Sequence, residues 1–95
     1  MDSYQKTTKK IKSVLDGKFE SVDLSDIASP STAISIIEND FKIEKSSEFT
    51  TNGWQWDFWQ YYSRGEEGSE SEEKFCLCGS GYYGELEFKV SKDNK

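Results

Sequence analysis

The residues best suited to recognition chemistry lie in one stretch, where six of the nine positions from 54 to 62 are aromatic. These are Trp54, Trp56, Phe58, Trp59, Tyr61 and Tyr62. Tryptophan and tyrosine are enriched at the hot spots of protein interfaces, and a partner's arginine can stack on their rings. Carboxylates surround them, at Asp57, Glu66, Glu67, Glu70, Glu72 and Glu73. This combination predicts non-covalent binding of a lysine- and arginine-rich protein partner.

Catalysis is disfavoured by the residue types available. The chain has no histidine, so the commonest general base and the Ser-His and Cys-His pairs are missing. Paired carboxylates can catalyse hydrolysis, but a domain of 95 residues rarely forms the deep cleft that raises a carboxyl pKa. The glutamates of segment 66–73 have no apolar neighbours in sequence. We therefore expect a protein that is not an enzyme and that carries no cofactor.

Metal and nucleotide sites are also disfavoured. Cys76 and Cys78 supply two thiolates, whereas a structural zinc site needs four ligands, and segment 66–73 lacks the spacing of a calcium loop. The stretch 79–84 is glycine-rich but lacks the lysine of a phosphate loop, and the alternation after it indicates a strand rather than a helix. We interpret residues 79–81 as a turn. The two cysteines are expected to be reduced, one in the core and one exposed, on opposite faces of a strand.

The charge is unevenly distributed. Residues 1–18 hold five lysines against two aspartates, a net of +3, while residues 19–95 carry a net of −9. An acidic body disfavours direct contact with nucleic acid or an anionic membrane. There is no apolar run long enough to span a bilayer and no secretory signal at the N-terminus. We expect a cytoplasmic protein.

Two helices are predicted in the first half of the chain. Residues 3–16 have an N-cap at Asp2 or Ser3, an apolar stripe, and Gly17 to end the helix. A second helix begins after Ser29 with Pro30 in its first position and ends between residues 40 and 43. Residues 18–28 fit neither period, so a short strand and an irregular crossover remain alternatives.

The period changes to two from Ile43 onward. Strands are predicted at 43–51, 54–62, 75–78 and 83–90, with an Asn52-Gly53 hairpin turn and a loop at 64–73. The fold class is α+β. It comprises two N-terminal helices (about 3–41) packed on a three- to four-stranded antiparallel β-meander (about 43–91), with a tail at 92–95, in one domain of residues 1–95.

The aromatic strand must divide its rings between two faces. Trp54, Trp56 and Phe58 alternate on one face, and Trp59 and Tyr61 on the other. A small domain has one core, so one face fills it and the other is available for binding. The sequence leaves open which face is inside.

These features predict a small acidic intracellular inhibitor of a basic nucleic-acid-handling protein. Immunity proteins, antitoxins and phage anti-defence or anti-CRISPR proteins act in this way, by occupying a cationic groove with carboxylates. The predicted contact residues are Asp57, Trp59, Tyr61, Tyr62, Glu66, Glu67, Glu70, Glu72 and Glu73. Two alternatives remain. One is a small-molecule or peptide-binding module lined by Trp54, Trp56 and Tyr83, and the other is a structural homodimer.

Overall fold

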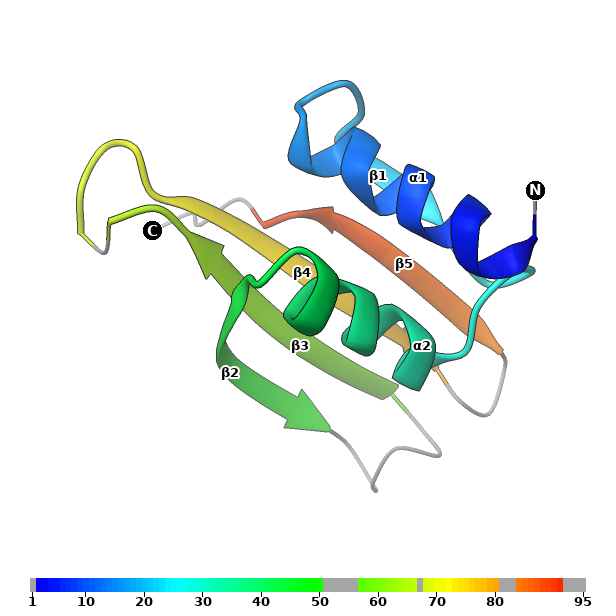
Figure 1. Ribbon diagram of the computed structural model, residues 1–95. Helices are drawn as coiled ribbons and strands as arrows, with labels where there is room; N and C mark the ends of the chain where they lie inside the picture. The colour runs from blue at the N-terminus through cyan, green and yellow to red at the C-terminus, as the bar shows by residue number, and fades with distance from the viewer. Residues whose placement is uncertain (1, 51–56, 67, 81–83, 92–95) are drawn as a thin grey trace.

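The computed structural model describes residues 2–50, 57–66, 68–80 and 84–91. Two helical segments lie on one face of a five-stranded antiparallel sheet (Figure 1). The elements are α1 (Ser3–Leu15), β1 (Ser21–Asp23), α2 (Pro30–Ser35), the π-helix η1 (Ile36–Asp40), β2 (Glu44–Thr50), β3 (Asp57–Arg64), β4 (Glu73–Ser80) and β5 (Glu85–Val90). The predicted α+β class is confirmed.

The sheet has more strands than the predicted three or four. Its order is β1-β5-β4-β3-β2, so β2 to β5 form the expected meander and β1 adds to the outer edge of β5. Val22 of β1 pairs with Phe88 of β5, across a separation of more than sixty residues. The short strand in the ambiguous segment 18–28 is therefore real, and it forms because β5 supplies a distant partner.

Helix α1 starts and stops on local signals. The Asp2 side chain accepts a hydrogen bond from the Gln5 backbone N–H at 2.8 Å, and the Gln5 side chain accepts one from the Asp2 backbone. This reciprocal capping satisfies N–H groups that lack partners inside the helix. Gly17 has φ +82°, which glycine adopts at low cost, and the chain turns there.

The second helix changes its winding halfway along. Ser29 caps it and Pro30 occupies its first position, as predicted, but α2 gives way to η1 after Ser35. The Phe41 N–H donates to the Ile36 carbonyl, five residues back, in the hydrogen-bond pattern of a π-helix. The predicted end near residue 40 is correct.

The core lies between the helices and the sheet. It contains Ile11, Val14 and Leu15 from α1, Ala33, Ile36 and Ile37 from α2 and η1, and Phe58, Tyr62, Phe75, Leu77, Leu86 and Phe88 from the strands. Tyr4, in the first turn of α1, lies outside this core: it is 45% exposed and its hydroxyl donates to the Asp40 carboxylate. That hydrogen bond joins the first turn of α1 to the last turn of η1.

The 79–81 turn prediction needs correction, because β4 continues to Ser80 and includes Gly79. Gly79 pairs with Leu86, and a Cβ atom built on it would lie 2.1 Å from the Glu85 carbonyl oxygen. The glycine is therefore required by the close approach of β5 and not by a turn. The Asn52-Gly53 hairpin and the 92–95 tail lie outside the described residues.

Arg64 ties the far end of β3 to the helices. Its guanidinium donates to the Leu15 carbonyl at 2.7 Å, near the end of α1, and pairs with Glu73 at 2.7 Å. The same guanidinium carbon lies 5.4 Å from the centre of the Phe75 ring. A cation at a helix C-terminus is electrostatically favourable.

No helix among the described residues has the length and apolar character needed to cross a membrane.

Candidate functional site

The side chains of β3 alternate between the core and the opposite face of the sheet. Phe58, Gln60 and Tyr62 are buried beneath the helices. Trp59 and Tyr61 point the other way and are half-buried. The helices of the described chain all lie on the first face (Figure 1). The sequence prediction that Trp59 and Tyr61 share a face is confirmed, and that face is the one away from the helices.

Strand pairing places specific neighbours beside these two rings. Trp59 is level with Cys78 on β4 and Glu87 on β5, and Tyr61 is level with Cys76 and Lys89. Paired residues in antiparallel strands point to the same side of the sheet. We call this set of six residues the aromatic face: Trp59, Tyr61, Cys76, Cys78, Glu87 and Lys89.

The charges on and around the aromatic face are mostly negative. The row Asp57, Ser80, Glu85 lies at one end, with both carboxylates exposed. With Glu44 of β2, the described part of the four strands β2 to β5 carries four carboxylates on this side against two lysines, Lys74 and Lys89. Lys89 lies 4.0 Å from Glu87, a loose contact. The surface is therefore an aromatic centre with an acidic surround.

Cys76 and Cys78 share the aromatic face, which corrects the expectation of opposite faces. Residues two apart on a strand point the same way. Cys76 is buried and Cys78 is half-buried. The neighbouring Cys76 thiol, with help from Lys89, lowers the pKa of Cys78, against the opposing effects of burial and of Glu87, to whose carboxylate the Cys78 thiol donates at 3.9 Å. The neighbouring Cys78 sulfur, together with burial, raises the pKa of Cys76. Cys78 is thus the more nucleophilic thiol of the pair.

Tyr61 stays a neutral phenol on this face. Burial is the main cause that raises the pKa of Tyr61 above 10.0, with the cysteine sulfurs adding to it. Its hydroxyl is therefore available to donate a hydrogen bond at neutral pH. With the Trp59 ring beside it, the face offers apolar area and a polar tip, which is the character of interface aromatics.

Tyr62 does not belong to this surface, and its assignment as a contact residue was wrong. Its side chain has 0% exposure. The Tyr62 hydroxyl donates to the Glu38 carboxylate at 3.1 Å, and the Gln60 amide donates to the Tyr62 hydroxyl at 3.0 Å. Tyr62 was assigned by its position beside Tyr61 in sequence, but neighbours on a strand face opposite ways. Its role is in the core.

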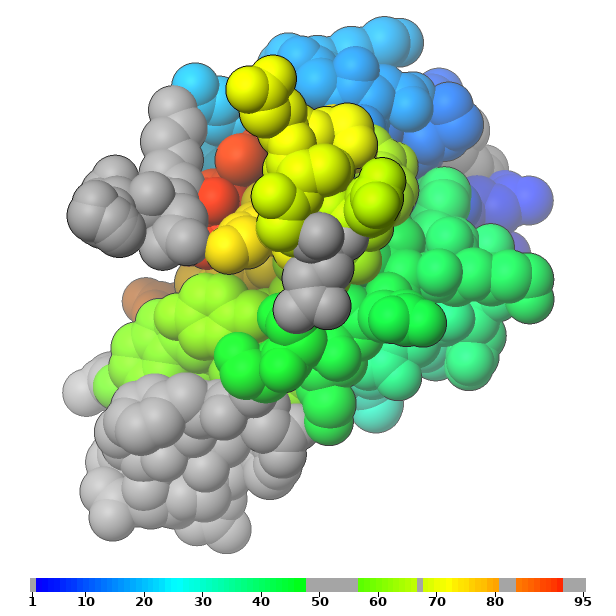
Figure 2. Space-filling view, turned by 90° about the vertical axis from the view of Figure 1, so that its left-hand side faces the viewer, coloured from blue at the N-terminus to red at the C-terminus, as the bar shows by residue number. Residues whose placement is uncertain are grey.

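The glutamate-rich segment joins β3 to β4 at the left-hand end of the molecule in Figure 1, the end that faces the viewer in Figure 2 (yellow). Asp57 begins β3 and Arg64 ends it, so about 23 Å of strand separate Asp57 from the segment that follows. Glu73 pairs with Arg64, and the Glu72 carboxylate accepts a hydrogen bond from the Gly68 N–H at 3.2 Å. Glu66 and Glu70 are exposed there. The predicted contact residues therefore form two groups rather than one surface.

Several predicted residues lie outside the described chain, and other residues were missed. The predicted residues outside the described chain are Glu67 and the pocket residues Trp54, Trp56 and Tyr83 of the alternative prediction. The residues that the sequence analysis missed are Glu85, Glu87 and Lys89. Their alternation with Leu86, Phe88 and Val90 was visible in the sequence. Their position beside Trp59 and Tyr61 depends on the register of β5 against β4, which the predicted meander did not specify.

No group of three or more histidine, cysteine or acidic side chains is arranged to hold a metal ion within residues 2–50, 57–66, 68–80 and 84–91. The molecule is a two-layer α+β protein whose candidate site is a sheet face rather than a cleft.

The chain matches no protein-family model, no curated protein and no solved structure. Its function is therefore argued from its own residues.

Proposed function

We propose that this protein is a small intracellular binding protein that docks a basic protein on its aromatic face. The observation that carries the proposal is the pair of half-buried rings, Trp59 and Tyr61, side by side on the sheet face away from the helices. Acidic residues at the ends and edges of that face surround them. An aromatic centre with a charged rim is the arrangement that protein interfaces use.

The partner class follows from charge. The chain has a net charge of −6, and the side of the sheet that bears the aromatic face carries four carboxylates (Glu44, Asp57, Glu85 and Glu87) against two lysines (Lys74 and Lys89). Such a surface attracts lysine- and arginine-rich partners at long range and orients them on approach. Proteins that handle nucleic acids have cationic grooves built for phosphates. We infer that the protein occupies such a groove as an inhibitor, as immunity proteins, antitoxins and anti-CRISPR proteins do.

In this mechanism, the protein contributes binding and no catalytic step. The rings of Trp59 and Tyr61 pack on the partner and exclude water, and partner arginines stack on them or pair with Glu85 and Glu87. Occupation of the groove prevents nucleic acid from entering. We place this activity in the cytoplasm, where two thiols remain reduced.

The test compares two matched double variants in a pull-down with tagged protein from lysate, at about 50 mM and about 500 mM salt, because screening grows with salt. Glu85→Gln with Glu87→Gln removes one charge from the aromatic face and one from the acidic row at its end. Glu66→Gln with Glu70→Gln removes two charges from the glutamate-rich segment and serves as the control. We expect the wild type and the control to retain a basic nucleic-acid-binding protein at low salt and release it at high salt. The first variant should retain much less.

The inhibition itself is then measured on the retained protein. Its binding to a labelled oligonucleotide should be lost on addition of the wild type and persist on addition of the Glu85/Glu87 variant. The opposite pattern, in which only the Glu66/Glu70 variant fails, would move the site to the glutamate-rich segment. If the pull-down recovers only untagged copies of this protein, and the protein sediments as a dimer, the result would support the homodimer alternative, with the aromatic face as its interface.

A further inference from the structure

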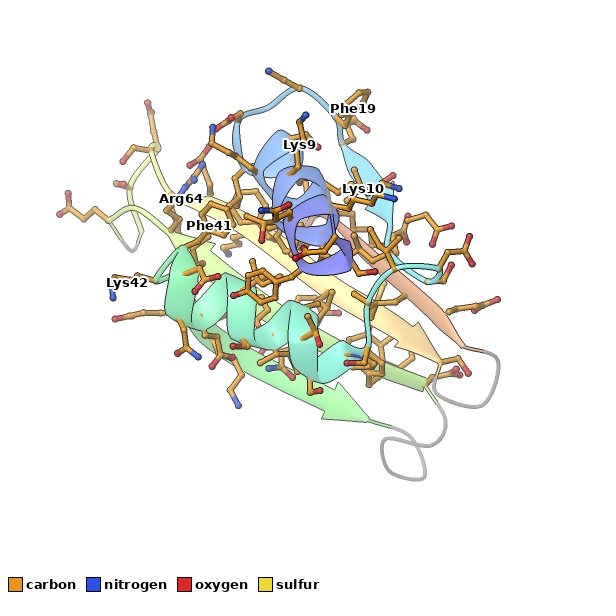
Figure 3. The ribbon with its side chains drawn as sticks, turned by 45° about the vertical axis from the view of Figure 1, so that its right-hand side comes forward. Lys9, Lys10, Phe19, Phe41, Lys42 and Arg64 are labelled. Carbon is orange, nitrogen blue, oxygen red and sulfur yellow. The ribbon has the colours of Figure 1, made fainter. Side chains whose placement is uncertain are left out.

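A second surface of opposite charge lies at the other edge of the sheet. A groove of about 860 Å³ runs between α1 and β1. Helix α1 forms one wall, the segment after it contributes Lys18 and Phe19, and β1 forms the other wall with Val22. Figure 3 shows Lys9, Lys10 and Phe19 together at the top of the view and Lys42 apart from them at its left.

The groove is basic although the protein is acidic. Its lining contains two aspartates, Asp16 and Asp23, and five lysines, Lys6, Lys9, Lys10, Lys12 and Lys18, a net of +3. Lys12 pairs with Asp16 at 2.7 Å. Within the described residues, Lys6, Lys9 and Lys18 make no ion pair. Lysines three or four apart on one helix face repel one another, and this repulsion is relieved when carboxylates bind between them.

The groove also has apolar parts. Phe19 is 59% exposed, more than any other large hydrophobic side chain that the structure describes. Val22 and Ile27 lie further in, and the aliphatic stems of the lysines add to the lining. This surface suits a ligand that carries apolar side chains as well as negative charge.

The β1 wall is an edge strand with outward backbone groups. Leu24 donates its N–H to the Leu86 carbonyl at 2.8 Å, and the Val90 N–H donates to the Glu20 carbonyl at 2.9 Å. In an antiparallel pair these hydrogen bonds alternate, so residues 21 and 23 direct their N–H and C=O groups away from β5. The Asp23 carbonyl does accept a hydrogen bond from the Lys10 ammonium, at 3.1 Å. The outward edge therefore borders the groove.

We propose that this groove binds an acidic, extended peptide segment of a partner protein, which adds to the edge of β1 as a sixth strand. The backbone of residues 21 and 23 would pair with the peptide, as in β-augmentation. The α1 lysines would contact the peptide carboxylates, and Phe19 would cover one of its apolar side chains. This site is separate from the aromatic face and does not depend on the function proposed above.

A peptide fits the groove better than a nucleic acid does. Lysines alone would serve phosphates, but the outward N–H and C=O groups of an edge strand match the repeat of another polypeptide. The net charge of −6 also repels a long polyanion, whereas a short peptide brings only a few charges into the groove.

The probe is a fluorescein-labelled peptide of glutamate alternating with valine, about eight residues or ~26 Å long when extended. Fluorescence anisotropy with the full chain at low salt should show saturable binding. Amide hydrogen exchange, measured by NMR, should slow at Ser21 and Asp23 when the peptide is bound. Lys9→Gln with Lys18→Gln should weaken binding about tenfold, the equivalent of ~1.4 kcal/mol. Lys42→Gln, outside the groove, should leave binding unchanged.

Three further measurements can overturn the proposal. The first is a peptide with proline at alternate positions, which lacks the N–H groups for pairing; equal affinity for it would rule out strand addition. Tighter binding of a single-stranded oligonucleotide of the same charge would make the groove a nucleic-acid site. A protein that sediments as a dimer, with the Ser21 amide already protected, would show the groove occupied by a second copy.

Two controls keep these outcomes interpretable. Phe19→Ser changes an exposed side chain, so it should weaken binding of the peptide without lowering the melting temperature of the protein. Loss of binding is then not confused with loss of fold. The Glu85/Glu87 variant of the aromatic face should bind the peptide as the wild type does. Failure of this groove is thereby separated from failure of the proposed function.

Discussion

The assignment of the two faces of β3 predicts opposite consequences for two adjacent tyrosines. Tyr62→Ala removes a side chain with 0% exposure from between the sheet and η1. Truncation of a fully buried aromatic residue costs about 3–5 kcal/mol, because a cavity is left behind. Tyr61→Ala removes a half-buried ring from the face away from the helices, where no closed cavity forms. We expect a loss of about 1–2 kcal/mol there, from lost area and cross-strand contact.

The hydroxyl of Tyr62 accounts for part of its contribution. Tyr62→Phe keeps the ring but leaves the Glu38 carboxylate without the 3.1 Å hydrogen bond and the Gln60 amide without the 3.0 Å one. Removing one partner of a buried hydrogen bond costs about 1–3 kcal/mol. Glu38 is only half-buried and still accepts a 3.3 Å hydrogen bond from the Gln60 amide, so we expect about 1 kcal/mol, the bottom of that range.

The assay is urea unfolding followed by tryptophan fluorescence and by circular dichroism, with each variant at the same pH and salt. The expected order of destabilisation is Tyr62→Ala first, with Tyr62→Phe and Tyr61→Ala well below it. For a domain of this size each kcal/mol corresponds to about 4–8 °C in melting temperature. Equal losses for Tyr61→Ala and Tyr62→Ala, or a larger loss for Tyr61→Ala, would refute the face assignment and with it the proposed binding surface.

Three other predictions concern single residues. Gly79→Ala should destabilise the protein by at least about 1–3 kcal/mol in urea unfolding, because its Cβ would lie 2.1 Å from the Glu85 carbonyl oxygen; a neutral result would mean that β5 moves away easily. Iodoacetamide should modify Cys78 before Cys76, as read by peptide mass spectrometry, since the neighbouring Cys76 thiol and Lys89 lower the pKa of Cys78 and Cys76 is buried; Lys89→Gln should slow the reaction, and an unchanged rate would contradict this cause. The Ser25 backbone N–H and hydroxyl lower the pKa of Asp23 below 3.8, so Asp23 binds protons more weakly in the folded state than in the unfolded state. Its contribution to stability is therefore present above pH 3.8 and lost as the pH falls through its folded pKa, and Asp23→Asn should flatten that part of the stability–pH curve.

Local signals in the sequence were sufficient for the helices and the meander. The Asp2 cap, the Ser29-Pro30 start and the period-two pattern after Ile43 each depend on neighbouring residues alone. For most of the helix and strand ends that the structure describes, the predicted and observed positions differ by no more than three residues. What the local signals did not give was β1, which has three residues and forms only because β5 pairs with it. Its formation depends on residues far along the chain.

The candidate site was predicted in part for the same reason. Trp59 and Tyr61 share a face because alternation along one strand requires it. The assignment of Tyr62 and of the glutamate-rich segment to that surface relied on nearness in sequence. A strand places neighbouring residues on opposite faces and carries its two ends about 23 Å apart, so nearness in sequence was misleading here. Glu85 and Glu87 were missed because the predicted meander places β5 beside β4 but does not fix the register that sets them level with Ser80 and Cys78.

The position of β5 in the sheet has a consequence for synthesis of the chain. This strand lies between β1 and β4 in the sheet. Strand β1 therefore cannot join β2, β3 and β4 until residues 85–90 have been made. Until then α1 lacks part of the surface on which it packs, because β1 has no strand beside it and Leu86 and Phe88 are missing from the core. Because most of the chain lies between β1 and β5, closing that contact is expected to be a slow step of folding. The nascent protein therefore exposes β4 as an unpaired edge until β5 emerges.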